Sequence, residues 1–154
     1  MQQIKRWRHT TKSLGYDMEL SAGILFLNNG SILMGHATET PHWDIPKGHV
    51  EKGEAHIDAA IRECFEETGF EVLPHQLVSL GVLDYTSKKQ LALFVYIGDD
   101  YPEAEKCFCA STFVKNGRTI TEMDGFKYVP YSEIRDHARK TMGHLLTKLV
   151  GSIS

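Results

Sequence analysis

Residues 48–70 read GHVEKGEAHIDAAIRECFEETGF, and this stretch predicts an amphipathic helix preceded by a glycine-rich turn. The helix is expected from Ala55 to Thr68, with Gly69 ending it, because glycine adopts the left-handed backbone of a helix C-terminus without strain. At about 100° per residue, one side of this helix is apolar and is expected to pack on the rest of the domain. That side carries Ile57, Ala60, Ile61, Cys64 and Thr68.

A second side of the same helix gathers three carboxylates, Glu63, Glu66 and Glu67, within an arc of roughly 100°. Carboxylates this close repel one another unless a cation is present. Hard oxygen ligands suit Mg²⁺ or Mn²⁺, which also bind phosphate. The ordinary alternative is a solvated acidic face in which Arg62 pairs with Glu66 and Asp58 across one helical turn. The glycine-rich turn, and the WDIPK segment before it, favour the metal interpretation, because such a loop can approach a phosphate.

The spacing of the polar and glycine positions is similar to the complete Nudix box. Reading along the chain, it runs Gly48, five residues, Glu54, seven residues, Arg62-Glu63, two residues, Glu66-Glu67, one residue, Gly69 and apolar Phe70. The resemblance implies an α/β fold: an α/β/α sandwich with a mixed β-sheet and a loop-helix-loop catalytic motif, formed by residues 1–154 as a single Nudix hydrolase domain. Cys64 departs from the larger aliphatic residue usual in the family, and we expect this to affect packing alone.

The resemblance also implies a divalent metal, Mg²⁺ or Mn²⁺, bound by the box. Glu63 and Glu67 are implied as the main ligands. Glu66 is implied as a further ligand or as the holder of a metal-bound water, and the carbonyl of Gly48 is an additional ligand. A bound cation of this kind neutralises phosphate oxygens and positions the attacking water.

An ion pair and a general base also bear on catalysis. Glu54 is implied to pair with Arg62 and hold the loop against the helix. A carboxylate must also take the proton of the attacking water, and relatives often place that glutamate outside the box. Glu122 is the first candidate and Asp124 the second, while Glu66 could act as the base instead. An exposed loop acid is the ordinary interpretation of Glu122.

Residues 42–50, HWDIPKGHV, are similar to the corresponding stretch of the diadenosine tetraphosphate hydrolases, and so are residues 21–23, SAG. The resemblance implies that Lys47 contacts phosphate. Trp43 is a candidate for stacking on a base, with packing beneath the loop as its alternative. The expected activity is therefore a metal-dependent pyrophosphohydrolase acting on a dinucleoside polyphosphate.

Two more substrate contacts are candidates at the hairpin expected near residues 86–89. Tyr85 could touch a base, with an ordinary core or surface aromatic as the alternative. Lys88 and Lys89 lie at the hairpin tip, where they could bind phosphate or remain solvated. These positions are weaker indicators than the box, because turns commonly carry lysine.

Other substrates remain open: the 5′ end of RNA, sugar nucleotides, dinucleotide cofactors and damaged nucleoside triphosphates. The basic segment Lys5–His9, which contains Trp7, could touch RNA or be a solvated tail. A domain that binds without catalysis usually loses box carboxylates, and this chain keeps all of them.

The composition limits the partners. The chain has 154 residues and a net charge of −3, which argues against broad nonspecific nucleic-acid binding, so a small nucleotide is expected and DNA is not. No apolar run reaches membrane-spanning length, so no membrane partner is expected. Three cysteines suit a reducing compartment, and the cytoplasm is the expected location. Cys107 and Cys109 lack a second pair at zinc spacing.

Alternating apolar residues and turn signals predict strands on both sides of the helix. The segment 37–55 is expected to be a long loop. A C-terminal helical region is expected to begin at Ser132, as N-cap, and to run to about Val150. The expected strands are Leu20–Leu27, Ile32–His36, Leu77–Tyr85, Gln90–Ile97, Phe108–Val114 and Phe126–Val129.

Overall fold

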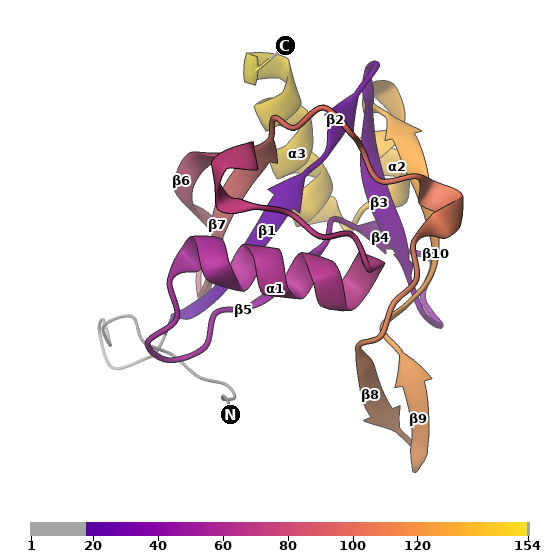
Figure 1. The fold of residues 1–154 in the computed structure, drawn as a ribbon. Coiled ribbons are helices and arrows are strands. Elements are labelled where there is room, and N and C mark those ends of the chain that lie inside the picture. Colours follow the sequence, from indigo (N-terminus) through magenta and orange to yellow (C-terminus); the bar gives the residue numbers. More distant parts are fainter. Residues whose placement is uncertain (1–17, 154) are drawn as a thin grey trace.

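The computed structural model describes residues 18–153, so the basic segment Lys5–His9 lies outside the described residues (Figure 1). The strands are β1 Glu19–Leu25, β2 Leu27–Asn28, β3 Ser31–Ala37, β4 Trp43–Asp44, β5 Lys47–His49, β6 Leu77–Thr86, β7 Lys89–Tyr96, β8 Thr112–Lys115, β9 Arg118–Thr121 and β10 Met123–Pro130. The helices are α1 His56–Thr68, α2 Ile134–His137 and α3 Lys140–Ile153, with single 3-10 turns η1 Pro74–Gln76, η2 Ala104–Lys106 and η3 Tyr131–Glu133.

The central sheet is mixed, as predicted. Its strand order is β5-β1-β7-β6, and β1 runs parallel to β7 from the Glu19–Lys89 pair to the Leu25–Val95 pair. The pairs β1·β5 and β6·β7 are antiparallel. The parallel pairing brings β5, which precedes α1, to the opposite edge of the sheet from β6.

A second sheet is built around β3. β10 lies along one edge of β3, while β2 and β4 share the other. The β2–β3 turn has positive φ at Asn29 (51°) and Gly30 (77°), the pair of values that a two-residue hairpin requires. The strands β4 and β5 fall inside the segment 37–55, which the sequence predicted as loop throughout. That prediction was wrong at these five residues, because such short strands are stabilised by pairing with β3 and β1.

Helices cover both faces of the central sheet, which gives the predicted α/β/α layers (Figure 1). Side chains of β7 alternate between the two faces. Ala92, Phe94 and Tyr96 join the apolar cluster beneath α1, together with Ala60 and Cys64. Leu91 and Leu93 face the other way and join the cluster that contains Met142 and Leu146 of α3. The apolar side of α1 is therefore buried, and its acidic side is left at the edge of the sheet.

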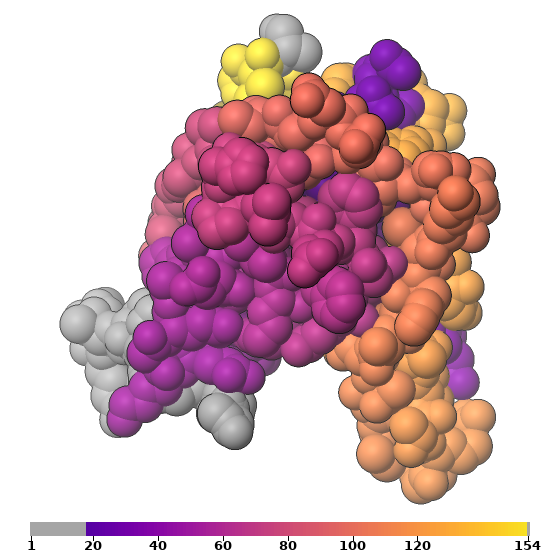
Figure 2. Space-filling model, in the orientation of Figure 1, coloured from indigo at the N-terminus to yellow at the C-terminus, as the bar shows by residue number. Residues whose placement is uncertain are grey.

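The hairpin β8–β9 stands away from the body of the molecule (Figures 1 and 2). Its turn has positive φ at Asn116 (52°) and Gly117 (77°). The predicted strand Phe108–Val114 was wrong in its first half, because β8 begins at Thr112, and β9 was not predicted.

The C-terminal helical region is also broken. Ser132 lies within a 3-10 turn rather than at an N-cap, and Ala138 is extended (ψ 162°) between α2 and α3. Across residues 18–153, no helix combines the length and apolar character needed to cross a membrane.

Candidate active site

The acidic helix is entered through β5 and a short loop. Gly23 lets β5 come close to β1, because a side chain there would meet Lys47 Cβ and the Pro46 carbonyl, both at 2.9 Å. Gly53 turns the loop with a φ of 81°. Gly69 (φ 78°) ends α1 by donating its N–H to the Phe65 carbonyl at 2.8 Å. The predicted loop-helix-loop is thus present.

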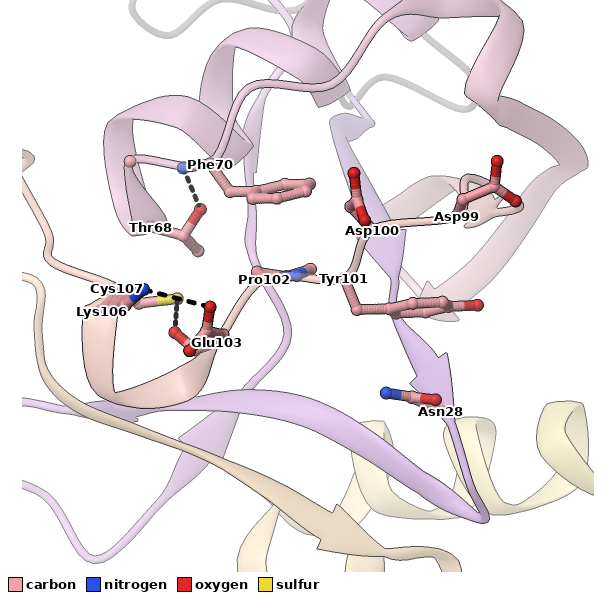
Figure 3. A pocket seen from close by; sticks show the side chains of 11 residues that line it. Asn28, Thr68, Phe70, Asp99, Asp100, Tyr101, Pro102, Glu103, Lys106 and Cys107 are labelled. Carbon is pink, nitrogen blue, oxygen red and sulfur yellow. Dashed lines mark hydrogen bonds and ion pairs between the residues drawn. The ribbon is translucent and has the colours of Figure 1, made fainter.

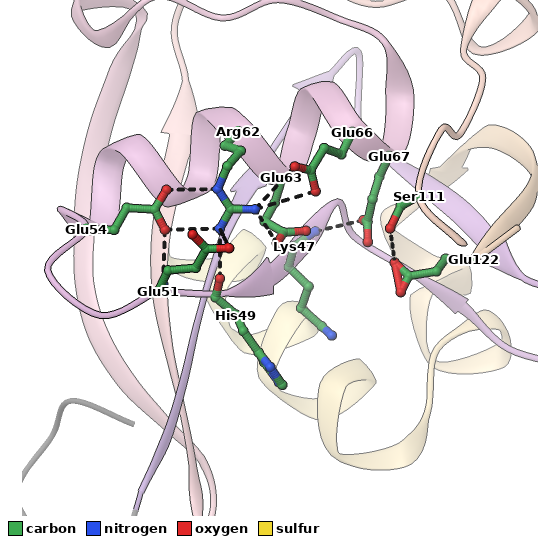
Figure 4. A network of polar contacts seen from close by, with 10 residues as sticks. All are labelled: Lys47, His49, Glu51, Glu54, Arg62, Glu63, Glu66, Glu67, Ser111 and Glu122. Carbon is green, nitrogen blue, oxygen red and sulfur yellow. Dashed lines mark hydrogen bonds and ion pairs between the residues drawn. The ribbon is translucent and has the colours of Figure 1, made fainter. Parts of the chain in front are cut away.

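Arg62 is the centre of a polar network that joins the loop to α1 (Figure 4). Its Nε and Nη2 donate to the two carboxylate oxygens of Glu54 at 2.8 and 3.0 Å, which is the expected contact. Its Nη1 donates to Glu63 at 2.9 Å and to Glu66 at 3.3 Å, and its Nη2 also reaches the His49 carbonyl at 3.0 Å. These carboxylates raise the pKa of Arg62, with the hydrogen bond to Glu54 as the largest cause. One guanidinium therefore neutralises much of the acidic cluster.

Glu67 is buried, at 5% exposed. The backbone N–H of Lys47 donates to its Oε1 at 3.1 Å, so β5 fixes the orientation of this carboxylate. Burial, followed by repulsion from Glu63 and Glu122, raises the pKa of Glu67 well above its ordinary value. A buried carboxylate with this surrounding would be stabilised by a cation.

Glu63 lies directly over the backbone of β5. A side chain at Gly48 would collide with the carboxylate of Glu63, so the close approach requires glycine at this position. Burial raises the pKa of Glu63 to about 7, although the charge of Arg62 acts to lower it. Glu63 and the Gly48 backbone are therefore side by side, as two ligands of one ion would need to be.

A cavity of about 530 Å³ opens beside these carboxylates. It is walled by β5, α1 and the segments that flank the β8–β9 hairpin, and its surface is mostly polar. Its lining comprises Ser21, Ala37, Asp44, Lys47, Gly48, His49, Glu51, Arg62, Glu63, Glu66, Glu67, Ser111, Glu122 and Met123.

Glu122 reaches the cavity from outside the box. It immediately precedes β10 and accepts a hydrogen bond from the Ser111 hydroxyl at 2.7 Å. Its charge is close enough to raise the pKa of both Glu63 and Glu67. Asp124, the second candidate base, instead contacts His36 Nδ1 at 2.6 Å and does not line the cavity.

Lys47 points its ammonium away from the carboxylates of α1. It forms an ion pair with Asp44 at 3.0 Å, which is the largest cause of a raised pKa for Lys47. Tyr85 is close by, since the charges of Lys47 and Asp44 both act on its hydroxyl, while burial raises its pKa. Of these two expected substrate contacts, Lys47 lines the cavity, whereas Tyr85 is not among the residues that line it.

The family model described as NUDIX domain matches residues 18–149. The chain belongs to the Nudix family of pyrophosphohydrolases. The match runs from the start of β1 into α3, so the box is set in the fold that the family uses.

Three similarities are informative. A 17.7 kDa protein from the e-segB intergenic region of Enterobacteria phage T4 is 39% identical over 87% of this chain and 94% of its own length. The asymmetrical bis(5′-nucleosyl)-tetraphosphatase of Rattus norvegicus is 41% identical over 59 residues, which are 36% of this chain and 39% of that enzyme. The crystal structure of a C. elegans Ap4A hydrolase binary complex has a TM-score of 0.60 at 24% identity, covering 86% of this chain and 97% of that one, and this is a likeness of fold.

Two expected substrate contacts lie apart from the Nudix carboxylates. Trp43 packs among His36 and His137, at ring-centroid distances of 5.2 and 6.0 Å, and Lys127 Nζ lies 4.4 Å from the centroid of its ring. Those contacts match the packing alternative for Trp43. Lys89 is exposed at the start of β7, opposite Glu19 in the backbone register of β1 and β7, and does not line the cavity.

Sequence reasoning missed two residues of the Nudix site. Asp44 lies three positions before Lys47, so the i,i+3 spacing of opposite charges was an available signal. Ser111 had no local signal, because it meets Glu122 only through the pairing of β8 with β9.

A larger cavity, of about 730 Å³, lies near the end of α1 but contains none of the box carboxylates (Figure 3). Its wall includes Asp99, Asp100 and Tyr101, and Glu103 there pairs with Lys106 at 3.2 Å. The smaller cavity is the candidate active site, because it is lined by the box carboxylates, Lys47 and Arg62.

Proposed function

We propose that this chain hydrolyses a phosphoanhydride bond in a dinucleoside polyphosphate, such as diadenosine tetraphosphate, using Mg²⁺ or Mn²⁺. The observation that carries the proposal is the convergence of Glu63, Glu67 and Glu122 on one cavity that Lys47 also lines. A single domain acting on a small nucleotide in the cytoplasm completes the proposal.

The donor set fits a hard divalent cation. Its side chains are carboxylates, and burial and mutual repulsion raise the pKa of Glu63 and Glu67. Within residues 18–153, no three His, Cys, Asp or Glu side chains are already grouped as ligands. Arg62 holds Glu63 and Glu66 by hydrogen bonds. We assign Glu63, Glu67 and the Gly48 carbonyl as ligands, with Glu66 as a further ligand or the holder of a bound water.

Each residue of the site then has a role in the reaction. When bound, the cation supplies charge neutralisation at phosphate oxygens and a more acidic water. Glu122 accepts the proton of the attacking water, and Glu66 is the alternative base. Arg62 and Glu54 hold the loop and helix together and so keep the carboxylates in position.

Lys47 recognises the polyphosphate chain in this proposal. Lys47 and Asp44 both line the cavity, and their charged groups form an ion pair at 3.0 Å. A phosphate oxygen can replace Asp44 as the partner of Lys47 or bind alongside it. Tyr85, which does not line the cavity, is proposed to contact the adenosine beyond it. The 59-residue similarity to the rat tetraphosphatase, an enzyme described as asymmetrical, supports this choice of substrate.

The fixed position of the bound polyphosphate predicts unequal products. Lys47 and the metal site hold the polyphosphate at fixed distances from a bound adenosine, so water attacks one phosphorus. Diadenosine tetraphosphate should then give a nucleoside triphosphate and a nucleoside monophosphate, and oxygen-18 water would show which product gains the label.

The test is a substrate panel with Mg²⁺ and with Mn²⁺. It should contain dinucleoside polyphosphates, nucleoside triphosphates, sugar nucleotides, dinucleotide cofactors and triphosphorylated RNA. Lys47→Met should raise KM for the tetraphosphate by about 10-fold or more, as loss of a charged contact does. Lys148→Met, which removes an exposed lysine of α3, is the matched control. Two diphosphates as products, or a clear preference for RNA or a sugar nucleotide, would contradict the proposed substrate.

A further inference from the structure

We propose that Ser111 is a positioning residue that aims the carboxylate of Glu122 at the candidate active site, a role that rests on the proposed function. The Ser111 hydroxyl donates to Oε1 of Glu122 at 2.7 Å, a length typical of a hydrogen bond to a charged acceptor. Both residues line the cavity of the box carboxylates.

The backbone holds the two residues opposite each other. β8 and β9 pair from Lys115–Arg118 back to Thr112–Thr121, and Ser111 and Glu122 are the residues that flank the last pair of this ladder. The Glu122 N–H donates to the Ser111 carbonyl at 2.9 Å. Ser111 and Glu122 therefore close the base of the projecting hairpin, where it joins the body of the molecule (Figure 1).

Both strands of this base are tied to the elements that form the site. The Ala110 N–H donates to the carbonyl of Glu66 at 2.8 Å, which links the Ser111 strand to α1. The Thr38 N–H donates to the carbonyl of Glu122 at 3.1 Å, which links the other strand to the end of β3. The serine hydroxyl is thus held in place relative to the acidic helix.

A donor is needed here because Glu122 faces like charges. Its carboxylate is one of the charges that raise the pKa of Glu63 and of Glu67, so repulsion acts to turn it out of the cavity. The single hydroxyl hydrogen of Ser111 binds one oxygen of Glu122 and leaves the other oxygen available to accept a proton from water. This arrangement fixes the orientation of the Glu122 carboxylate and leaves one of its oxygens able to accept the proton.

The test compares Ser111→Ala, Ser111→Thr, Glu122→Gln and the Ser111→Ala/Glu122→Gln double variant on diadenosine tetraphosphate. Ser111→Ala should lower kcat by about 10-fold, the scale of one hydrogen bond to a charged group. KM and the Mg²⁺ concentration for half-maximal rate should not change. Ser111→Thr should restore the rate, because it keeps the hydroxyl. In the Glu122→Gln background, Ser111→Ala should have no further effect.

The outcomes separate this inference from the proposed function. Ser152→Ala, which removes an exposed serine hydroxyl near the end of α3, controls for an unspecific effect. Multiplicative losses in the double variant, or equal losses in Ser111→Ala and Ser111→Thr, would overturn the positioning role. If the wild type is active and Ser111→Ala has the same kcat, the positioning role is overturned and the proposed function stands. A wild type that hydrolyses no substrate in the panel would overturn the proposed function, and the inference with it.

Discussion

At the scale of the residue, Arg62 connects the loop before α1 to the acidic side of that helix. Its guanidinium contacts Glu54, Glu63 and Glu66 at 2.8 to 3.3 Å, so the repulsion between these carboxylates is offset within the loop-helix motif. The contact with Glu54 is bidentate, a geometry that lysine cannot reproduce. Arg62 thus connects the stability of the loop to the positions of the proposed ligands.

The first prediction is that Glu54 and Arg62 are energetically coupled. Glu54→Gln and Arg62→Lys should each lower activity and speed amide hydrogen exchange in residues 50–54. A double-mutant cycle on the free energy of unfolding should give a coupling of roughly 1 kcal/mol or more, since the pair is partly buried and bidentate. Losses that simply add would mean that the ion pair does not hold the loop.

The sequence was sufficient for the residues of the box but not for all of their neighbours. The resemblance to the Nudix box implied the contact of Glu54 with Arg62, and helical spacing predicted the grouping of Glu63 with Glu67. Glu122 could be named only as a candidate, because its position depends on long-range pairing. Ser111 could not be found at all, since its partner lies eleven positions away across a hairpin that the local pattern did not reveal.

At the scale of the element, the long strands and α1 were predictable because their signals are local. Alternation marks β6 and β7, and glycine marks the end of α1. The strands β4, β5 and β9 were missed, since strands of two to four residues form only against a partner. The break at Ala138 lacks glycine or proline, so the C-terminal region looked like one continuous helix.

The second prediction concerns the hairpin. Its tip contributes little to the core: Phe113 and Val114 are 37% and 72% exposed, and the pairs of Lys115 and Arg118 with Glu39 lie on the surface. Replacing residues 114–119 with Asn-Gly keeps the pair of Phe113 with the buried Ile120. This change should leave the thermal midpoint within about 5 °C and kcat on diadenosine tetraphosphate within about 3-fold, because the base at Ser111 and Glu122 is kept.

The same shortened chain carrying Ser111→Ala is its control, and it should lose activity as the full-length variant does. If shortening alone removed most of the activity, the tip rather than the base would be the functional part of the hairpin.

At the scale of the whole molecule, the buried carboxylates make stability depend on pH and on metal. The folded-state pKa of Glu63 is raised by burial from 4.5 to about 7, and burial also raises the pKa of Glu67 well above its ordinary value. An acid with a raised folded pKa stabilises the fold below its unfolded pKa, and this contribution is lost as pH rises through the folded pKa. The fold therefore becomes less stable as the pH rises through this range unless a cation is bound.

The third prediction follows from this sign. In chelator, the thermal midpoint should fall between pH 4.5 and pH 7, the two pKa values of Glu63, and Glu67, whose pKa is raised in the same direction, should add to the fall. Added Mg²⁺ should reverse most of the loss, since it binds the folded state preferentially. Glu63→Gln should make the thermal midpoint change less between pH 4.5 and pH 7. A midpoint that is independent of pH in chelator would contradict the burial of these acids.

The central claim is that a metal held by the carboxylates of α1 drives phosphoanhydride hydrolysis. The most direct measurement is the rate of diadenosine tetraphosphate hydrolysis by the wild type and by Glu67→Gln, each in excess chelator and across a Mg²⁺ titration. We predict that the wild type is inactive in chelator and recovers with Mg²⁺. Glu67→Gln, with its fold verified by circular dichroism, should lose turnover by about 100-fold or more at saturating Mg²⁺. Full activity in chelator, or near-normal turnover by folded Glu67→Gln, would contradict the claim.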